Sequence, residues 1–318
     1  MGGGRIRTAL DLDAIGRIRD AHAGVVHLAA FGGWNGPHPP SSTSSSTGVA
    51  MTGKRWFEVF DDFNLSHGDP FDGIDWDYEG HDDRSSPTSR FTLETLDVMV
   101  DFSVEAKKRG YIVSMAPAES YLDPTIEVGG IDAVFSTDLD LPPRSYTYDR
   151  YGATDDDRDL VRRAGFSHAG RQCYAYVLAR AGMETFDWVS LQLYEAYSPF
   201  AHDVHRKRMG QDEALMMRIR RLVDGYAITG LPLDASTHEV RVPPSKLVIG
   251  IANGWADGLK FCRVDPSSIR RAYETTVAEY GRGFLGVMFW TLEEEGGDDA
   301  DDRRLTHSLT REFDNPSP

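Results

Sequence analysis

The stretch "FDGIDWDYEG", residues 71–80, carries four acidic residues within eight positions, interspersed with apolar and aromatic ones. Successive side chains of a β-strand point to opposite faces. A strand here places Gly73, Asp75, Asp77 and Glu79 on one face and Asp72, Ile74, Trp76 and Tyr78 on the other. The apolar set is suited to packing beneath helices. The acidic set then forms a row of carboxyl groups on the inner face of a sheet.

The rest of the chain predicts that this sheet is parallel. Short apolar runs typical of buried strands occupy 24–31, 71–76, 111–118, 187–194, 246–252 and 283–290, and helical patterns occupy 9–24, 90–110, 170–182, 212–226 and 267–281. Such alternation is typical of an α/β barrel or a doubly wound sheet. Active sites of α/β barrels lie at the carboxyl ends of the strands. Glu79, the acid closest to that end, is therefore the first candidate catalytic residue.

The spacing of the acids has a chemical consequence. Same-face neighbours on a strand lie about 6.6 Å apart. Like charges at that separation raise the pKa of at least one carboxyl group, so the row retains a proton near neutral pH. A proton held on Glu79 would make this residue a general acid. The alternative, an exposed amphipathic strand whose acids face water, is disfavoured by the buried strands predicted on either side.

The composition indicates a single domain and excludes several classes of function. The 318 residues are 40% hydrophobic and 11% aromatic, enough for one large core, and we expect a single domain over 1–318. The formal net charge of −16 argues against nonspecific binding to nucleic acid. Two cysteines, Cys173 and Cys262, are too few for a disulfide framework or the usual structural zinc site. No apolar run is long enough to span a bilayer, and the start has no secretory signal, so we expect a soluble chain.

"DGIDWDYE" resembles the D-x-x-D-x-D-x-E signature of glycoside hydrolase family 18, the chitinases and their relatives, with every acid present. Four weaker matches to the family occur along the chain in the family's order. They are "AAFGGW" (29–34) with Ala30 where the family has Ser, "VSMAPA" (113–118), "LQLYE" (191–195) and "VMFWTLEEE" (287–295). The resemblance covers roughly 24–295. It implies a chitinase-type (β/α)8 barrel that cleaves β-1,4 bonds next to N-acetylglucosamine without a cofactor or metal.

The resemblance also implies roles for individual residues. Glu79 would protonate the leaving oxygen and later activate water. Asp77 would orient the substrate acetamide and stabilise an oxazolinium ion, and Asp75 would share a proton or hydrogen bond with Asp77. The Tyr194 hydroxyl would donate a hydrogen bond to the acetamide carbonyl, and Trp290 would form the apolar floor beneath the sugar. The alternative for Tyr194 is an ordinary tyrosine at a strand end, and the alternative for Trp290 is packing in the core. Substrate contacts are also expected from Gln192, Met115, Glu195, Gly33 and Trp34, and structural roles from Asp72 and Gly73.

Two features depart from the family pattern. Glu195 stands where relatives carry Asp or Asn, a change not expected to abolish the chemistry. The S-x-G-G segment is normally the third barrel strand, yet only 23 residues precede residue 24, and 9–24 is predicted to be one helix. We therefore expect a barrel that lacks its first two strands through N-terminal truncation and exposes an edge at the strand with Trp290. The compartment stays open, because a missing start would also remove a secretion signal.

Three functions remain after this reading. The leading one is a chitinase, a monomer acting on chitin or N-acetylglucosamine-containing oligosaccharides. An endo-β-N-acetylglucosaminidase acting on N-glycans would use the same signature. An inactive carbohydrate-binding relative is the third, and the presence of Glu79, Asp77 and Tyr194 argues against it. The polar insertion at 136–165 and the acidic loop and helix at 296–318 carry no further assignment.

Overall fold

The computed structural model describes residues 6, 8, 10–39, 51–81, 86, 91–123, 133–134, 172–194, 198–205, 207–234, 237–253, 262–292 and 304–314. The expected insertion at 136–165 and the acidic stretch at 293–303 lie outside the described residues. No helix in the described part of the chain is both long and apolar enough to cross a membrane.

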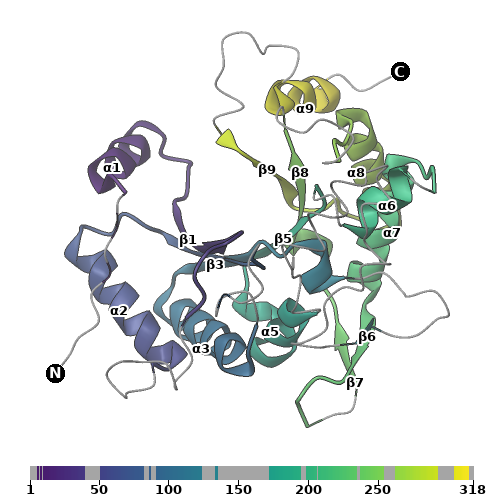
Figure 1. Ribbon diagram of the computed structural model, residues 1–318. Helices are drawn as coiled ribbons and strands as arrows, with labels where there is room; N and C mark the ends of the chain where they lie inside the picture. The colour runs from purple at the N-terminus through teal and green to yellow at the C-terminus, as the bar shows by residue number, and fades with distance from the viewer. Residues whose placement is uncertain are drawn as a thin grey trace.

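The main sheet contains all six strands that the apolar runs predict. In spatial order these are β1 (Leu28–Gly33), β2 (Gly73–Tyr78), β3 (Ile112–Met115), β5 (Trp188–Gln192), β8 (Leu247–Ala252) and β9 (Gly286–Trp290), and every neighbouring pair is parallel. The sheet curls into a half-barrel with the helices on its outer side (Figure 1). The α/β prediction is therefore confirmed.

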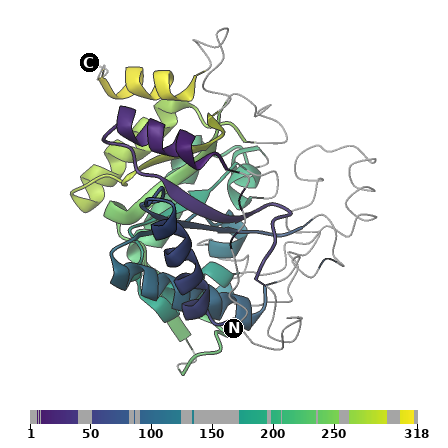
Figure 2. The same ribbon diagram turned by 90° about the vertical axis from the view of Figure 1, so that its left-hand side faces the viewer.

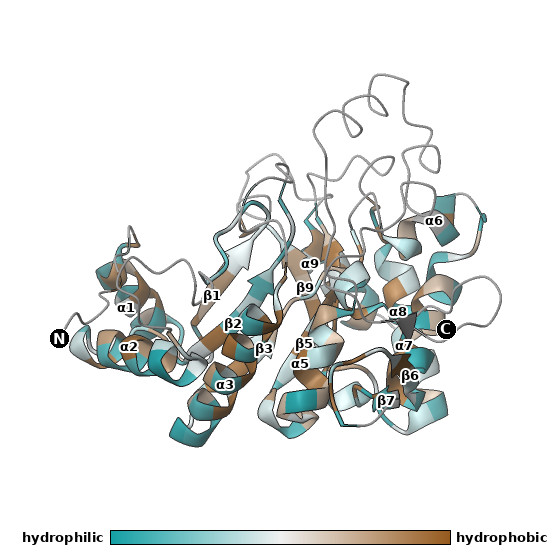
Figure 3. Ribbon diagram, turned by 60° about the horizontal axis from the view of Figure 1, so that its bottom comes forward, coloured by the Kyte–Doolittle hydropathy of each residue, from teal (hydrophilic) through white to brown (hydrophobic). Residues whose placement is uncertain are grey.

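Seven of the eight α-helices in the described residues form two groups around the sheet, and α1 (Leu12–Ala21) belongs to neither. The other seven are α2 (Gly53–Ser66), α3 (Leu93–Arg109), α5 (Cys173–Ala181), α6 (Pro199–His205), α7 (Gln211–Asp224), α8 (Pro266–Tyr280) and α9 (Leu305–Asp314). One group packs in the order α2, α3, α5, and the other in the order α6, α7, α8, α9 (Figures 1 and 2). Hydrophobic residues gather on the strands and on the helix faces towards them (Figure 3).

Helix α3 shows why these segments are helical. The Thr92 hydroxyl accepts a hydrogen bond from the Thr95 backbone N–H at 3.1 Å and so caps the first turn. Three basic residues occupy the last turn, where positive charges interact favourably with the negative end of the helix dipole. Gly110, with φ of 96°, then ends the helix in the left-handed conformation that glycine adopts without strain. Capping at both ends thus defines the helix that covers β2.

The outer face of β2 is the centre of the core. Ile74, Trp76 and Tyr78 are all buried. The Trp76 ring packs against Phe102 of α3 with centroids 5.3 Å apart, and its indole N–H donates to Ser103 Oγ at 2.7 Å. The outward half of the sequence alternation is therefore confirmed, because these side chains contact the helix layer.

A smaller sheet was not expected. It consists of β4 (Ala133–Val134), β6 (Tyr226–Thr229) and β7 (Thr237–Val240), with β6 and β7 antiparallel. The helix predicted over 212–226 is wrong at its end, because α7 stops at Asp224. Gly225 has φ of 92°, which breaks the helix, and buried Tyr226 instead pairs with Val240.

Within the described residues, the main sheet is open. Strands β1 and β9 each pair with one neighbour, so both are edges. The exposed edge expected at the strand with Trp290 is present. The eight-stranded barrel that has lost its first two strands through truncation stays a prediction.

Candidate active site

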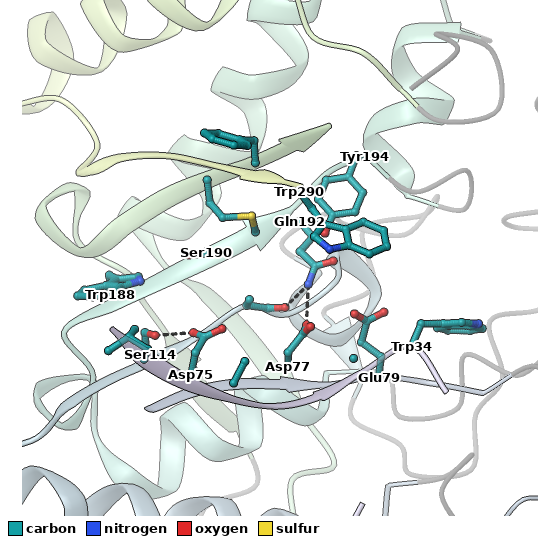
Figure 4. Close-up of a pocket in the computed structure, with 16 residues that line it drawn as sticks. Trp34, Asp75, Asp77, Glu79, Ser114, Trp188, Ser190, Gln192, Tyr194 and Trp290 are labelled. Atoms are coloured by element: carbon teal, nitrogen blue, oxygen red, sulfur yellow. Dashed lines mark hydrogen bonds between the residues drawn. The ribbon is translucent and has the colours of Figure 1, made fainter. Parts of the chain in front are cut away.

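The concave face of the sheet carries a pocket of about 560 Å³. Its lining comes from β1, β2, β3, β5 and β9 and the segments that follow them: Leu28, Ala30, Gly33, Trp34, Asp75, Asp77, Glu79, Ser114, Ala116, Trp188, Ser190, Gln192, Tyr194, Met288, Phe289 and Trp290 (Figure 4). The pocket therefore collects side chains from segments up to 260 residues apart, and most of its polar groups lie on β2, β3 and β5.

The three acids that share a face of β2 form one wall of the pocket (Figure 4). Asp75 accepts a hydrogen bond from the Ser114 hydroxyl. Asp77 accepts one from the Gln192 amide, with 2.8 Å between Nε2 and Oδ1. Glu79 lies close enough to Asp77 for its negative charge to raise the pKa of the Asp77 carboxyl group. Two carboxyl groups this close do not both ionise readily, so this pair is suited to holding a proton in the pocket.

The electrostatics of the row agree with this geometry. Burial raises the pKa of Asp75 to about 6, against the opposing effect of the Ser114 hydrogen bond. Burial also raises the pKa of Asp77 well above its usual range, and the negative charges of Glu79 and then Asp75 raise it further. Glu79 itself is buried. The row therefore resists full ionisation near neutral pH; burial is the main cause, and the like charges of neighbouring acids add to it at Asp77.

Close backbone approach lets the strands carry this row. A Cβ on Gly73 would lie 2.1 Å from the Ile112 carbonyl oxygen, and one on Gly32 would lie 2.3 Å from the Asp77 carbonyl oxygen. Both positions therefore need glycine. Asp72 points the other way and accepts a hydrogen bond from the His27 backbone N–H at 2.8 Å, which ties the start of β1 to β2.

Aromatic side chains form the opposite wall. The rings of Tyr194 and Trp290 are stacked, with centroids 6.5 Å apart and 23° between their planes. Tyr194 is buried, whereas Trp290 is 56% exposed. Asn253, at the end of β8, holds the chain after Trp290 through two hydrogen bonds to the Thr291 backbone, at 2.7 and 3.0 Å. Trp290 therefore presents an aromatic surface from a fixed backbone.

Comparisons with known proteins fit this geometry. No family model and no curated protein sequence matches the chain. Among solved structures, a family 18 chitinase from Chromobacterium violaceum superposes with a TM-score of 0.55 and 17% identity, over 98% of this chain and 72% of that one. A fungal endo-β-N-acetylglucosaminidase of glycosyl hydrolase family 18 gives a TM-score of 0.50 and 14% identity, over 93% of this chain and 75% of that one.

The chain has a family 18 chitinase-like fold. Within this fold, the pocket brings together Asp75, Asp77, Glu79, Tyr194, Trp290, Gln192, Gly33 and Trp34, all named by the sequence analysis. Glu195 lies outside the described residues. Across the part of the chain that the structure describes, no group of three or more His, Cys, Asp or Glu side chains is arranged to hold a metal ion.

One expected residue is misplaced. Met115 was expected to line the pocket, but it is fully buried in the core on the helix side of β3. Its strand neighbours Ser114 and Ala116 line the pocket instead. The error is one of parity, because adjacent strand residues face opposite sides. Pairing β3 with β2 in the register Asp75 to Ser114 would have avoided it.

Residues that sequence reasoning missed also shape the site. On β5 the alternation that places the predicted Gln192 in the pocket also places Trp188 and Ser190 there, a signal visible in "DWVSLQLY". His38 is buried beside the Tyr78 ring, and its Nε2 lies 2.8 Å from the Glu79 carbonyl oxygen. No spacing pattern in the sequence indicates the His38 contact, because residue 38 follows β1 in an irregular segment.

Proposed function

We propose that this protein is a glycoside hydrolase that cleaves β-1,4 bonds next to N-acetylglucosamine, with chitin or chito-oligosaccharides as substrate. The observation that carries the proposal is the position of Glu79. It ends the row formed with Asp75 and Asp77, and it lines the same pocket as Tyr194 and Trp290. A carboxyl acid, a neighbouring counter-charge and an aromatic surface are the groups that glycoside hydrolysis requires.

The chemistry follows the substrate-assisted route. The carbonyl oxygen of the substrate acetamide attacks the anomeric carbon, the glycosidic bond breaks, and the leaving oxygen takes the proton of Glu79. The resulting oxazolinium ion is positive, and Asp77 supplies negative charge beside it. Glu79, now a carboxylate, removes a proton from water as the water oxygen attacks the anomeric carbon. The acetamide is restored, and the configuration is retained.

The other pocket residues have supporting parts in this proposal. The Tyr194 hydroxyl donates to the acetamide carbonyl, and Trp290 covers one face of the sugar ring, whose C–H groups suit an aromatic surface. Gln192 fixes Asp77 through the 2.8 Å hydrogen bond. Trp34 lines the pocket beyond Glu79 and extends the sugar site in that direction (Figure 4).

A second candidate is cleavage of the chitobiose core of N-glycans. The fold likeness to the fungal endo-β-N-acetylglucosaminidase favours it, because that protein shares the fold at a comparable TM-score. The two activities use the same acid row and differ in the space that the substrate needs outside the pocket.

The test is hydrolysis of a chromogenic di-N-acetylchitobioside, and of a high-mannose N-glycan, by the chain and its Glu79→Gln variant. We expect turnover of the chitobioside, a loss of at least about 1,000-fold in the variant and initial release of the β-anomer. Glu274→Gln, on the exposed side of α8, removes a carboxylate far from the pocket and is the matched control. A folded chain that binds chito-oligosaccharides without cleaving either substrate would replace the proposal with a carbohydrate-binding function.

A further inference from the structure

Asp75 has a neighbour on each side in the sheet. In the register of the strands it pairs with Ala30 of β1 and with Ser114 of β3. All three side chains line the pocket and therefore lie on the same face. Neighbouring strands are about 4.8 Å apart, so either position can bring a small side chain against the Asp75 carboxyl.

Only one of these neighbours carries a hydroxyl. The Ser114 hydroxyl donates to Asp75 Oδ1, whereas Ala30 has nothing to donate. Among the described residues, this is the one side chain that donates to the Asp75 carboxyl. Ser114 is fully buried, whereas Asp75 is partly exposed towards the pocket. The S-x-G-G strand that this chain resembles has its serine at the Ala30 position, which means that the hydroxyl here stands on the opposite neighbour.

The charges around Asp75 give this contact its importance. On its own strand it faces Asp77 and Glu79, and both are acids. The pocket residues contributed by β1, β3, β5 and β9 include no ionisable group, and Tyr194 lies after β5. Burial raises the pKa of the Tyr174 phenol of α5, and the negative charges of Asp77, Glu79 and Asp75 raise it further, so Tyr174 also lies within reach of the row. No cation lines the described pocket, so an ionised Asp75 depends on hydrogen bonding.

We infer that Ser114 is the positioning residue that keeps Asp75 ionised and fixed, so that the proton of the acid row stays with Asp77 and Glu79. The inference rests on the proposed function, because the distribution of the proton matters only if Glu79 is to deliver it. A neutral Asp75 would weaken the negative field beside the oxazolinium ion and compete with Asp77 as proton acceptor.

The kinetic test compares pH profiles of kcat/KM for the wild type, Ser114→Ala, Ala30→Ser and the double variant. We expect the acidic limb of Ser114→Ala to move up by about one pH unit, as a lost hydrogen bond to a charged group predicts. Ala30→Ser in that background offers a hydroxyl from the other side and should return at least half of the shift. Ser190→Ala removes a buried pocket hydroxyl that does not contact Asp75, so its acidic limb should stay in place.

A second readout needs no turnover. The ¹³C resonance of the Asp75 carboxyl, assigned by its loss in Asp75→Asn, reports the pKa of this group directly. We expect a higher pKa in Ser114→Ala and a lower one in Ala30→Ser, which sits at an exposed position and should fold as the wild type does. An unchanged Asp75 pKa in both variants would overturn the inference. If the wild type proves inactive, the proposed function fails, and the carboxyl titration still decides the role of Ser114.

Discussion

Gln192 and Asp77 are joined by a 2.8 Å hydrogen bond, although β5 and β2 are separated in the sheet by β3. The same Gln192 amide donates to the Ala116 carbonyl, which follows β3. Such a contact across an intervening strand requires a strongly curled sheet. The curl is therefore what brings the middle acid of β2 under the control of a residue 115 positions away.

Replacing Gln192 with Met, which has a similar shape, should damage both activity and stability. Asp77 would lose its donor and the pKa of its carboxyl would rise further, so we expect kcat to fall at least about 10-fold. The unsatisfied Ala116 carbonyl should cost about 1–3 kcal/mol of unfolding free energy. Steady-state kinetics and urea denaturation measure the two effects. A variant with wild-type kcat would show that Asp77 needs no support from β5.

Asp75 should make stability depend on pH. Its pKa is about 6 in the folded protein and about 3.9 in an unfolded chain, so the folded state binds the proton more tightly. The contribution of this group is complete below about pH 4 and is lost as pH rises through 6, by about 3 kcal/mol in total and about 2 kcal/mol between pH 4.5 and 7.5. Asp75→Asn should remove that part of the slope in denaturation midpoints between pH 4.5 and 7.5. If the denaturation midpoints of the wild type and of Asp75→Asn change with pH in the same way, the pKa of Asp75 is not raised.

Two glycines at the first positions of their strands provide a matched pair. A Cβ on Gly73 would meet the Ile112 backbone at 2.1 Å, whereas one on Gly286 would meet no atom within 4 Å. Gly73→Ala should therefore reduce the unfolding free energy by at least about 2 kcal/mol, because β2 and β3 must separate. Gly286→Ala should change it by less than about 0.5 kcal/mol. Equal thermal midpoints for the two variants would refute the close approach of the strands.

Two arginines of α7 allow a buried ion pair to be compared with an exposed one. Arg218 is buried and contacts Glu119 and Asp203, each at 2.7 Å. Arg218→Met leaves Glu119 buried without its cation, while Asp203 keeps its 2.7 Å contact with Lys207, and the change should cost about 3–5 kcal/mol in unfolding free energy. Arg220→Met removes an exposed pair with Glu279 and should leave the thermal midpoint unchanged. Differential scanning calorimetry compares them, and a similar loss in both would mean that burial does not determine the effect.

Trp290 should matter for binding and not for folding. Because 56% of it is exposed, Trp290→Ala should change stability by less than about 0.5 kcal/mol. Loss of the sugar-facing ring should raise KM for chito-oligosaccharides about 10-fold, which corresponds to about 1.4 kcal/mol. Leu292→Ala, two residues on and 78% exposed, lies outside the pocket lining and is the control. Wild-type KM in Trp290→Ala would remove this residue from the sugar site.

The local parts of this fold follow from periodicity. The alternation within 71–80 predicts both the buried outer face of β2, with Trp76 against α3, and the row of acids opposite it. Helix α3 follows equally from its apolar spacing, its basic last turn and Gly110. These features depend on the order of side chains along one segment, which the sequence states directly.

The contacts between segments could not be predicted from the periodicity within each segment. Met115 was assigned to the wrong face because the register of β3 against β2 comes from pairing, not from the apolar run itself. The sheet of β4, β6 and β7 was missed because its strands are two to four residues long and because β4 pairs with β6 across 95 positions.

Periodicity within residues 71–80 is enough to place Asp75, Asp77 and Glu79 on one face, with Glu79 at the end of the row. The groups that surround each acid depend on how distant segments pack: Ser114 beside Asp75, Gln192 on Asp77, and the stacked Tyr194 and Trp290 across the pocket. The physical reason is that side-chain direction along a strand is a local property with a period of two. Strand order, register and curl arise from long-range packing, which no single segment encodes.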